Sequence, residues 1–208
     1  MKATKTALFE AAKAWEAGAV RAIVTAAPAL ARAADAKGRT ALHIACAVNP
    51  KSGKLGENDG IRTVAALLAA GAELEAFVPT DEDEGDFRAN PLWYAVSRGR
   101  NLPLVRFLLK QGADPSYSLW AVVFQDDAAI CRELLKAKPR LNLVAHGETP
   151  IFYAARLQRL KTLALLIEAG ADPSIRDLQG RDAVGIARAR RLPKEIVNRL
   201  VALNARNS

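Results

Sequence analysis

The stretch "TPIFYAARLQRLKTLALLIEAGADPSIRDLQGRD", residues 149–182, predicts two helices joined by a turn. Thr149 can accept a hydrogen bond from the free amides of a first helical turn, and Pro150 stands where a helix tolerates proline. A second, Leu-rich segment ends at Gly170, which can adopt the left-handed conformation that stops a helix, and Pro173 prevents the helix from resuming. The stretch closes on a further capping residue, Asp182.

The opening of this stretch recurs along the chain. Its copies are TALFEAA (6–12), TALHIAC (40–46), NPLWYAV (90–96), a weaker YSLWAVV (117–123), TPIFYAA (149–155) and DAVGIAR (182–188). Each copy except the weaker one begins with Thr, Asn or Asp, so we expect residues such as Thr6 and Thr40 to cap helices. Each copy also has a small residue near its sixth position, which lets neighbouring helices approach closely: Ala11, Ala45, Ala95, Val122, Ala154 and Ala187. Such periodicity predicts an array of repeats.

The T-P-L-H-x-A opening, followed by L-L-x-x-G-A-D, resembles the ankyrin repeat, as found in bacterial-type ankyrin repeat domain proteins. The resemblance covers about residues 5–203 and implies an all-α ankyrin-repeat solenoid of about six helix-turn-helix repeats with short finger loops. We expect a single domain over residues 1–208. Its repeats are expected at about 5–37, 38–88, 89–115, 116–146, 147–179 and 180–205.

The spacing of the openings predicts where this chain departs from the family. Thr40 to Asn90 is 50 residues, so the second repeat carries extra sequence, both at residues 49–60 and in the acidic stretch VPTDEDEGDFRANP (78–91). We interpret that stretch as an enlarged finger with Phe77 and Phe87 anchoring its base. Asn90 to Tyr117 is only 27 residues, which predicts a shortened next finger.

The resemblance implies a non-catalytic scaffold that binds a partner protein through its concave face and fingers. Carried over by position, the eighth and ninth residues of each repeat and those just before each opening give the candidate partner-binding residues of the helix ends and fingers: Arg98, Phe124, Gln125, Arg156, Leu157, Arg181 and Arg190. Arg98, Arg156 and Arg190 predict a basic stripe for an acidic partner surface. The acidic finger adds Asp81, Glu82, Asp83, Glu84 and Asp86, which either contact a basic partner, shield the stripe, or form a neutral insertion.

The formal net charge of +8 leaves an alternative function open. Residues 1–90 carry 11 basic and 12 acidic side chains, whereas residues 91–208 carry 19 and 10, with a dense cluster at ARARR (187–191). Nucleic-acid or polyanion binding through the basic C-terminal half is therefore the alternative. Against it stand the acidic finger, which repels phosphate, and a sequence without the motifs of a fold that reads nucleic acid.

Catalytic, metal and cofactor sites are not indicated by the sequence. His43 and Cys46 are three residues apart, but Cys131 and His146 fall two repeats away, too far to share a metal ion with them. We expect Cys46 and Cys131 to be reduced and buried, and Trp15 to be exposed. With no secretory signal and no apolar run of about 20 residues, we expect a monomeric cytoplasmic protein without membrane contact.

Overall fold

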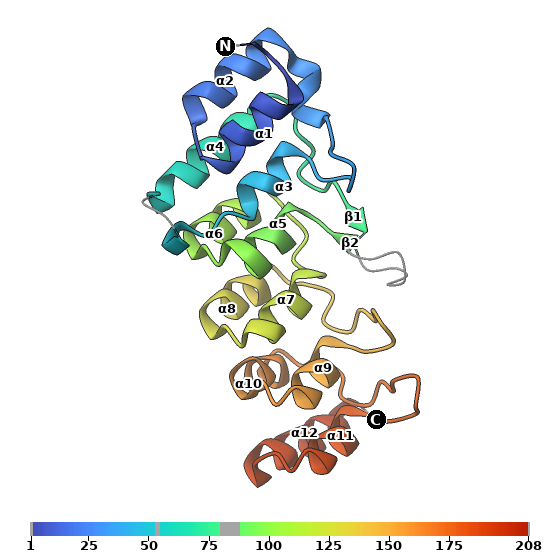
Figure 1. Cartoon of the computed structure of the whole chain (residues 1–208). Coiled ribbons are helices and arrows are strands. Elements are labelled where there is room, and N and C mark those ends of the chain that lie inside the picture. Colours follow the sequence, from blue (N-terminus) through green and yellow to red (C-terminus); the bar gives the residue numbers. More distant parts are fainter. Residues whose placement is uncertain (1, 53–54, 80–87, 208) are drawn as a thin grey trace. The chain divides into compact units, whose positions relative to one another are not determined.

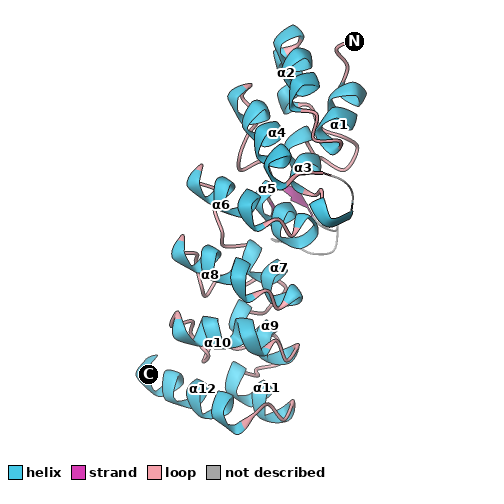
Figure 2. Ribbon diagram, turned by 90° about the vertical axis from the view of Figure 1, so that its left-hand side faces the viewer, coloured by secondary structure: helices cyan, strands magenta, loops and turns pink. Residues whose placement is uncertain are grey.

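The structure, a computed structural model, describes residues 2–52, 55–79 and 88–207, and nearly all of its regular elements are helices (Figure 2). Its internal contacts divide it into two compact units. Unit 1 holds the described residues before position 115, and unit 2 those from Pro115 on. None of the helices formed by described residues has the length and hydropathy needed to cross a bilayer.

Unit 1 contains three helix pairs packed in two layers. The inner layer consists of α1 (Lys5–Lys13), α3 (Ala41–Cys46) and α5 (Pro91–Tyr94), which continues into the π-helical turn η3 (Ala95–Gly99). The outer layer consists of α2 (Ala17–Ala26), α4 (Glu57–Ala69) and α6 (Leu102–Lys110). Each helix packs on its pair partner and on the next helix of its own layer, as in Figure 1. The 3-10 turns η1 (Pro28–Arg32) and η2 (Pro50–Ser52) lie in connections.

Unit 2 repeats this arrangement with three more pairs. Its inner helices are α7 (Ser118–Gln125), α9 (Pro150–Arg156) and α11 (Ala183–Ala189). Its outer helices are α8 (Ala128–Lys136), α10 (Leu160–Glu168) and α12 (Lys194–Asn207). The all-α array of helix pairs expected from the sequence is confirmed.

The small residue of each opening is buried in its inner helix. Ala45, Ala95, Val122, Ala154 and Ala187 are fully buried, and Ala11 nearly so. With no long side chain at this position, neighbouring inner helices can pack directly against each other. The predicted role of these residues in close helix packing is therefore supported by their burial.

The helix ends follow the predicted chemistry, with one exception. Thr149 and Asn90 accept hydrogen bonds from the backbone N–H groups of Phe152 and Trp93, and glycines with positive φ follow α4, α6 and α10. The expectation for Thr6 was wrong, because α1 begins earlier and Thr4 accepts the bond from Ala7 instead.

The finger between the second and third pairs begins as an antiparallel hairpin. Strand β1 (Val78–Pro79) pairs with β2 (Arg88–Ala89), with Val78 opposite Ala89. Phe77 does not anchor this base: its side chain is 45% exposed, with the guanidinium of Arg88 over its ring at 5.7 Å. Phe87 lies outside the described residues. The next finger is short, as predicted, because α7 begins at Ser118, soon after α6 ends at Lys110.

Trp15 is buried, so the expectation that it is exposed was wrong. It takes a left-handed conformation (φ 55°) just after α1, and its side chain packs between α3 and α4. Its indole N–H donates to the carbonyl of Ala45 at 2.8 Å, and Gly60 of α4 lies so close that a Cβ there would be 2.7 Å from the ring. Trp15 therefore ties the first helix pair of unit 1 to the second.

The third inner helix contains one residue more than its counterparts. In the last three copies of the opening, a residue in the left-handed conformation stands nine positions after the first residue of the copy. These residues are Asp126, Gln158 and Arg191. In the third copy the left-handed residue is Arg100, ten residues after Asn90, and η3 absorbs the additional residue. The turn brings Gly99 against the backbone carbonyl of Cys46, where a Cβ would clash.

Replacing Gly99 with alanine should lower the stability of the protein by about 1–3 kcal/mol, because the added methyl group must push η3 away from the rigid backbone of α3. Thermal or urea unfolding of Gly99→Ala measures the change. Gly18→Ala in α2 is the matched control, since a Cβ there meets nothing within 4 Å and alanine favours the helix by about 0.5–1 kcal/mol. Equal midpoints for Gly99→Ala and the wild type would contradict the prediction.

Candidate functional site

Two fingers are held by the same aspartate–arginine clamp. In unit 2, Asp177 accepts hydrogen bonds from the backbone N–H groups of Gln179 and Arg181, and its Oδ2 lies 2.6 Å from Nη2 of Arg181. In unit 1, Asp35 and Arg39 make the corresponding bonds, with a 2.7 Å ion pair. Both fingers share the spacing D-x-x-G-R, a signal that the sequence contained and that our prediction missed.

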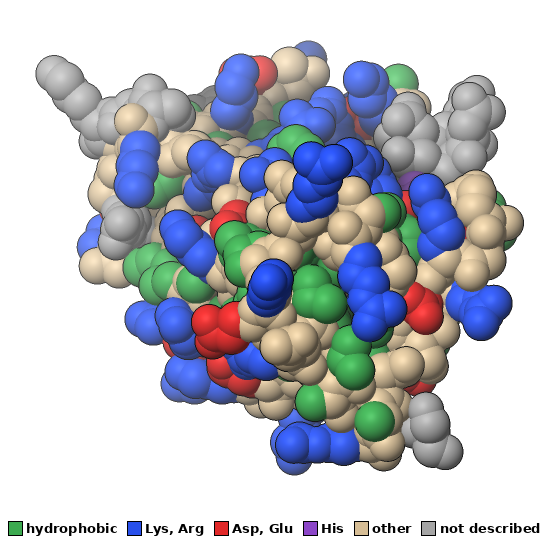
Figure 3. All heavy atoms as spheres, turned by 90° about the horizontal axis from the view of Figure 1, so that it is seen from below, with side chains coloured by type: hydrophobic (Ala, Val, Ile, Leu, Met, Phe, Trp, Pro, Cys, Tyr) green, Lys and Arg blue, Asp and Glu red, His purple; other side chains and the backbone are tan. Residues whose placement is uncertain are grey.

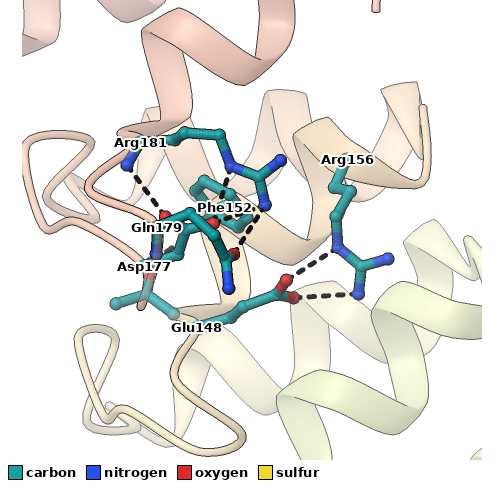
Figure 4. A network of polar contacts seen from close by, with 7 residues as sticks. Glu148, Phe152, Arg156, Asp177, Gln179 and Arg181 are labelled. Atoms are coloured by element: carbon teal, nitrogen blue, oxygen red, sulfur yellow. Dashed lines mark hydrogen bonds and ion pairs between the residues drawn. The ribbon is translucent and has the colours of Figure 1, made fainter.

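The clamp gives Arg181 a structural role that its selection as a partner-binding residue did not anticipate. Its guanidinium also lies 5.8 Å from the centroid of the Phe152 ring and hydrogen-bonds Gln179 (Figure 4). The Asp177 side chain is only 2% exposed. Burial raises the pKa of this carboxyl, but the hydrogen bonds from Arg181 and from two backbone N–H groups outweigh that effect and hold the pKa below its ordinary value.

Arg156 is engaged within unit 2 as well. Its Nε lies 2.7 Å from Oε1 of Glu148 and its Nη2 lies 3.0 Å from Oε2, a two-point pairing visible in Figure 4. The same guanidinium lies over the ring of Tyr153 at 5.2 Å. Glu148 thus neutralises Arg156 and leaves less of its charge for an acidic partner.

Arg98 in unit 1 makes a similar contact without the carboxylate. It is exposed at the end of η3, with its guanidinium 5.8 Å from the Tyr94 ring centroid. Tyr94 stands at the same place after its opening as Tyr153, but Arg98 is four residues after Tyr94, whereas Arg156 is three after Tyr153. The π-helical turn thus preserves an arginine–tyrosine pair despite the extra residue.

Phe124 is the main exposed aromatic side chain at an inner helix end of unit 2. It is 56% exposed near the C-terminus of α7, and Arg159 lies over its ring at 5.9 Å. Phe124 lies beside the connection from α7 to α8, and Arg159 lies in the connection from α9 to α10. Asp126 links these two connections, because its Oδ1 accepts hydrogen bonds from the backbone N–H and the hydroxyl of Thr162 at 2.9 and 3.0 Å. No repeat position had pointed to Arg159.

We call Phe124, Leu157, Arg159 and Leu160 the Phe124 patch. Leu157 follows α9 and is half-buried, and Leu160 begins α10 with 38% of its surface exposed. Gln125, the last residue of α7, is also half-buried, and Arg190 is exposed directly after α11. The patch combines apolar surface with an arginine.

The acidic finger residues fall outside this description. Asp81, Glu82, Asp83, Glu84 and Asp86 lie among the residues that the structure does not describe. Their three possible roles therefore stay predictions.

The histidine and cysteines that we considered as metal ligands are occupied or buried. Nδ1 of His43 lies 2.9 Å from the Thr40 hydroxyl, and its Nε2 lies 2.9 Å from the carbonyl oxygen of Ala76. Burial lowers the pKa of His43 to about 4. Cys46 and Cys131 are free thiols, buried as predicted, and burial raises both pKa values, that of Cys131 to about 12.

Comparison with known proteins agrees with these features. Residues 92–177 match the sequence model described as ankyrin repeats (3 copies). This part of the chain consists of ankyrin repeats, and the chain has the ankyrin-repeat fold. A 45-residue segment is 47% identical to the human ankyrin repeat domain-containing protein 29 and covers 22% of this chain, but only 15% of that protein's length.

Two crystal structures of ankyrin proteins are similar over most of their length. An ankyrin repeat domain from Acinetobacter baumannii AYE superposes with a TM-score of 0.72 at 25% identity, covering 94% of this chain and 96% of the other. The ankyrin repeat protein EF0377 superposes with a TM-score of 0.68 at 21% identity, covering 98% of both chains, which is evidence for the fold alone. Ankyrin repeats are general protein–protein interaction modules, and the family is typically non-catalytic.

Removing the guanidinium of Arg181 should destabilise the protein by about 1–3 kcal/mol, because it leaves the buried Asp177 carboxylate without its cation. Urea unfolding of Arg181→Ala measures this cost. Arg176→Ala is the control, since Arg176 is an exposed cation of the same finger, and it should change stability by less than about 0.5 kcal/mol. Equal effects of the two variants would show that the clamp contributes nothing particular.

The protein should lose stability as the pH falls from about 6.5 to about 4. The unfolded chain binds a proton at His43 near its ordinary pKa of 6.5, whereas the folded chain resists protonation until about pH 4. The contribution of neutral His43 is complete above the unfolded pKa. It amounts to about 3 kcal/mol at one pKa unit per 1.4 kcal/mol.

Urea unfolding of the wild type and of His43→Gln at pH 7.5, 5.5 and 4.5 measures this loss. The variant should be less stable at pH 7.5, and its stability should change much less with pH. A wild-type stability that is flat across this range would contradict the prediction.

Proposed function

We propose that this ankyrin-repeat protein is a non-catalytic scaffold that binds a partner protein at the Phe124 patch of unit 2. The observation that carries the proposal is the exposure of Phe124 in a position where a solvated surface favours polar side chains. An aromatic ring flanked by arginine is typical of residues that dominate binding energy at protein interfaces. Gln125 is the last residue of α7, Arg156 is the last residue of α9, and Leu157 follows Arg156, so these three residues adjoin the two connections that hold this anchor.

The charge around the patch supports an acidic partner. Arg159 lies over the Phe124 ring. Arg190 is exposed at the start of the connection from α11 to α12, and its carbonyl accepts a hydrogen bond from the side chain of Gln158 in the connection from α9 to α10. We propose that carboxylates of the partner approach these two cations, while its apolar side chains cover Phe124. Arg156 and Arg181, already paired with Glu148 and Asp177, hold the surrounding structure in place.

The proposal extends to Arg98 and the acidic finger in a separate role. Arg98 is an exposed cation in unit 1, so we propose that it can meet an acidic surface by itself. The finger residues Asp81, Glu82, Asp83, Glu84 and Asp86 are proposed to act in recognition, since five like charges on one loop repel one another and add little to stability. We propose that the chain works as one monomeric domain of six repeats.

Affinity capture from an extract of the source cells should retain a partner with the wild type and lose it with Phe124→Ala. Removing an anchor ring at an interface costs at least about 1.4 kcal/mol, or a tenfold loss of affinity. Val201→Ala is the control, because Val201 is an apolar residue of α12 with 39% exposure, away from the patch. Identical retention by Phe124→Ala and the wild type would overturn this placement of the interface.

A further inference from the structure

Two connections in the last two helix pairs of unit 2 are rich in basic side chains. The connection of α9 to α10 reads RLQRLK (156–161) and that of α11 to α12 reads RARRLPK (188–194), with no acidic residue in either. Five acidic residues of these pairs occur at the opposite helix ends, in and beside the fingers: Glu148, Glu168, Asp172, Asp177 and Asp182. A sixth, Glu195, follows Lys194 in the first turn of α12. The connections therefore form a basic boundary of unit 2.

The two connections lie next to each other. The side-chain amide of Gln158 donates to the carbonyl of Arg190 at 2.9 Å. Both connections turn through a left-handed residue at the same repeat position, Gln158 and Arg191, and α9 packs on α11 as α10 packs on α12. We define the basic edge as the exposed cations of these connections: Lys161, Arg188, Arg190, Arg191 and Lys194.

The cations of the basic edge have no acidic partner within the described chain. Some other basic side chains of unit 2 are neutralised, as Arg199 is by Glu168 at 3.1 Å and Lys136 by Glu133 at 2.9 Å. The five side chains of the basic edge take part in no such pair. Figure 3, which looks onto the end of the chain formed by α11 and α12, shows many more basic than acidic side chains.

The composition of the basic edge favours phosphate groups as its ligand. Three of its five cations are arginines, whose planar guanidinium groups match phosphate oxygens in two-point contacts. Gln158, Ala189 and Pro193 lie among these cations and offer little apolar surface, and the exposed Leu160 beside Lys161 belongs to the Phe124 patch. A protein interface needs an apolar centre, and a membrane-binding surface needs an apolar face. A polyphosphate chain needs neither, because release of its counterions supplies the free energy of binding.

We propose that the basic edge binds the phosphate backbone of a nucleic acid, without regard to base sequence. The five cations extend over two successive helix pairs, whose axes are about 8–10 Å apart, so they can follow several consecutive phosphates. The positive end of the α12 dipole, at Lys194, adds to their attraction for anions. The site shares no residue with the Phe124 patch and only Arg190 with the surface proposed to meet a partner protein, so it extends beyond the proposed protein-binding function.

Fluorescence anisotropy with labelled single-stranded and duplex DNA of mixed sequence tests the proposal. For duplex DNA, five phosphate contacts predict a fall in affinity of about 500-fold between 50 and 200 mM salt, at a slope of about −0.9 per contact. The variant Arg188→Gln/Arg191→Gln/Lys194→Gln retains two contacts. Its affinity for DNA at 50 mM salt should be at least about tenfold lower than that of the wild type. Between 50 and 200 mM salt its affinity should fall only about tenfold. Arg188→Lys/Arg191→Lys keeps the charges and should keep the steep salt dependence.

The matched control removes the same charge from other parts of unit 2. Arg132→Gln/Arg176→Gln/Arg206→Gln changes three exposed cations outside the basic edge and should bind DNA nearly as the wild type does. Thermal unfolding of each variant confirms that it is folded. Phe124→Ala should also leave DNA binding unchanged, so the two proposals fail or succeed separately.

Several results would overturn the proposal. The proposal is wrong if the wild-type protein binds no DNA at 50 mM salt. It is also wrong if the two glutamine triple variants lower the affinity for DNA equally, since this would indicate diffuse attraction by net charge. The same holds if poly-glutamate or vesicles containing anionic lipid bind as tightly as DNA and depend equally on Arg188, Arg191 and Lys194. In that case the partner is an acidic protein or a membrane surface.

Discussion

Direct packing between successive inner helices is the constraint on which the other features depend. Ala45 and Ala95 in unit 1, and Ala154 and Ala187 in unit 2, are fully buried at the same repeat position. A longer side chain there would force the helices apart and expose the apolar faces that each pair can bury only against its neighbours. Because the residue type in the middle of each inner helix is fixed in this way, the repeats differ from one another mainly at the helix ends, in the fingers and in the connections.

The two kinds of helix end use their charges differently. Some arginines of unit 2 meet carboxylates of their own chain, as Arg181 in the finger meets Asp177 and Arg156 at the end of α9 meets Glu148. At the connections, cations such as Arg190 and Lys194 are exposed and form no ion pair with a described residue. Position within a repeat therefore does not indicate which arginines are available to a partner. Their local pairing does, and it separates residues that support the structure from residues that can bind.

Much of the fold follows from residue types at fixed spacing. The repeat openings, the capping residues Asn90 and Thr149 and the burial of both cysteines could be predicted, because each depends on local sequence or on helical periodicity. The burial of Trp15 could not, since it depends on a left-handed turn and on Gly60 in another repeat.

The candidate site was less accessible to sequence reasoning than the fold. Phe124 was identified by its repeat position, but the contact of Arg159 with its ring joins two connections and has no signature in either. The D-x-x-G-R clamp did have one, at two places in the sequence, and it would have separated Arg181 from the binding residues. The division of the chain into six repeats within one domain stays a prediction, as do the roles of the acidic finger.

The π-helical turn η3 shows that an inner helix can change its length without changing its ends. Asn90 still caps the helix and Arg100 still takes the left-handed turn, while the additional residue is confined to five positions between them. A one-residue insertion at this point changes what one repeat presents to its surroundings and leaves the repeats on either side in register. Alignment of such a repeat from its first residue alone assigns the wrong counterparts to its last residues, so homologous surface positions in ankyrin arrays are better matched from both helix ends.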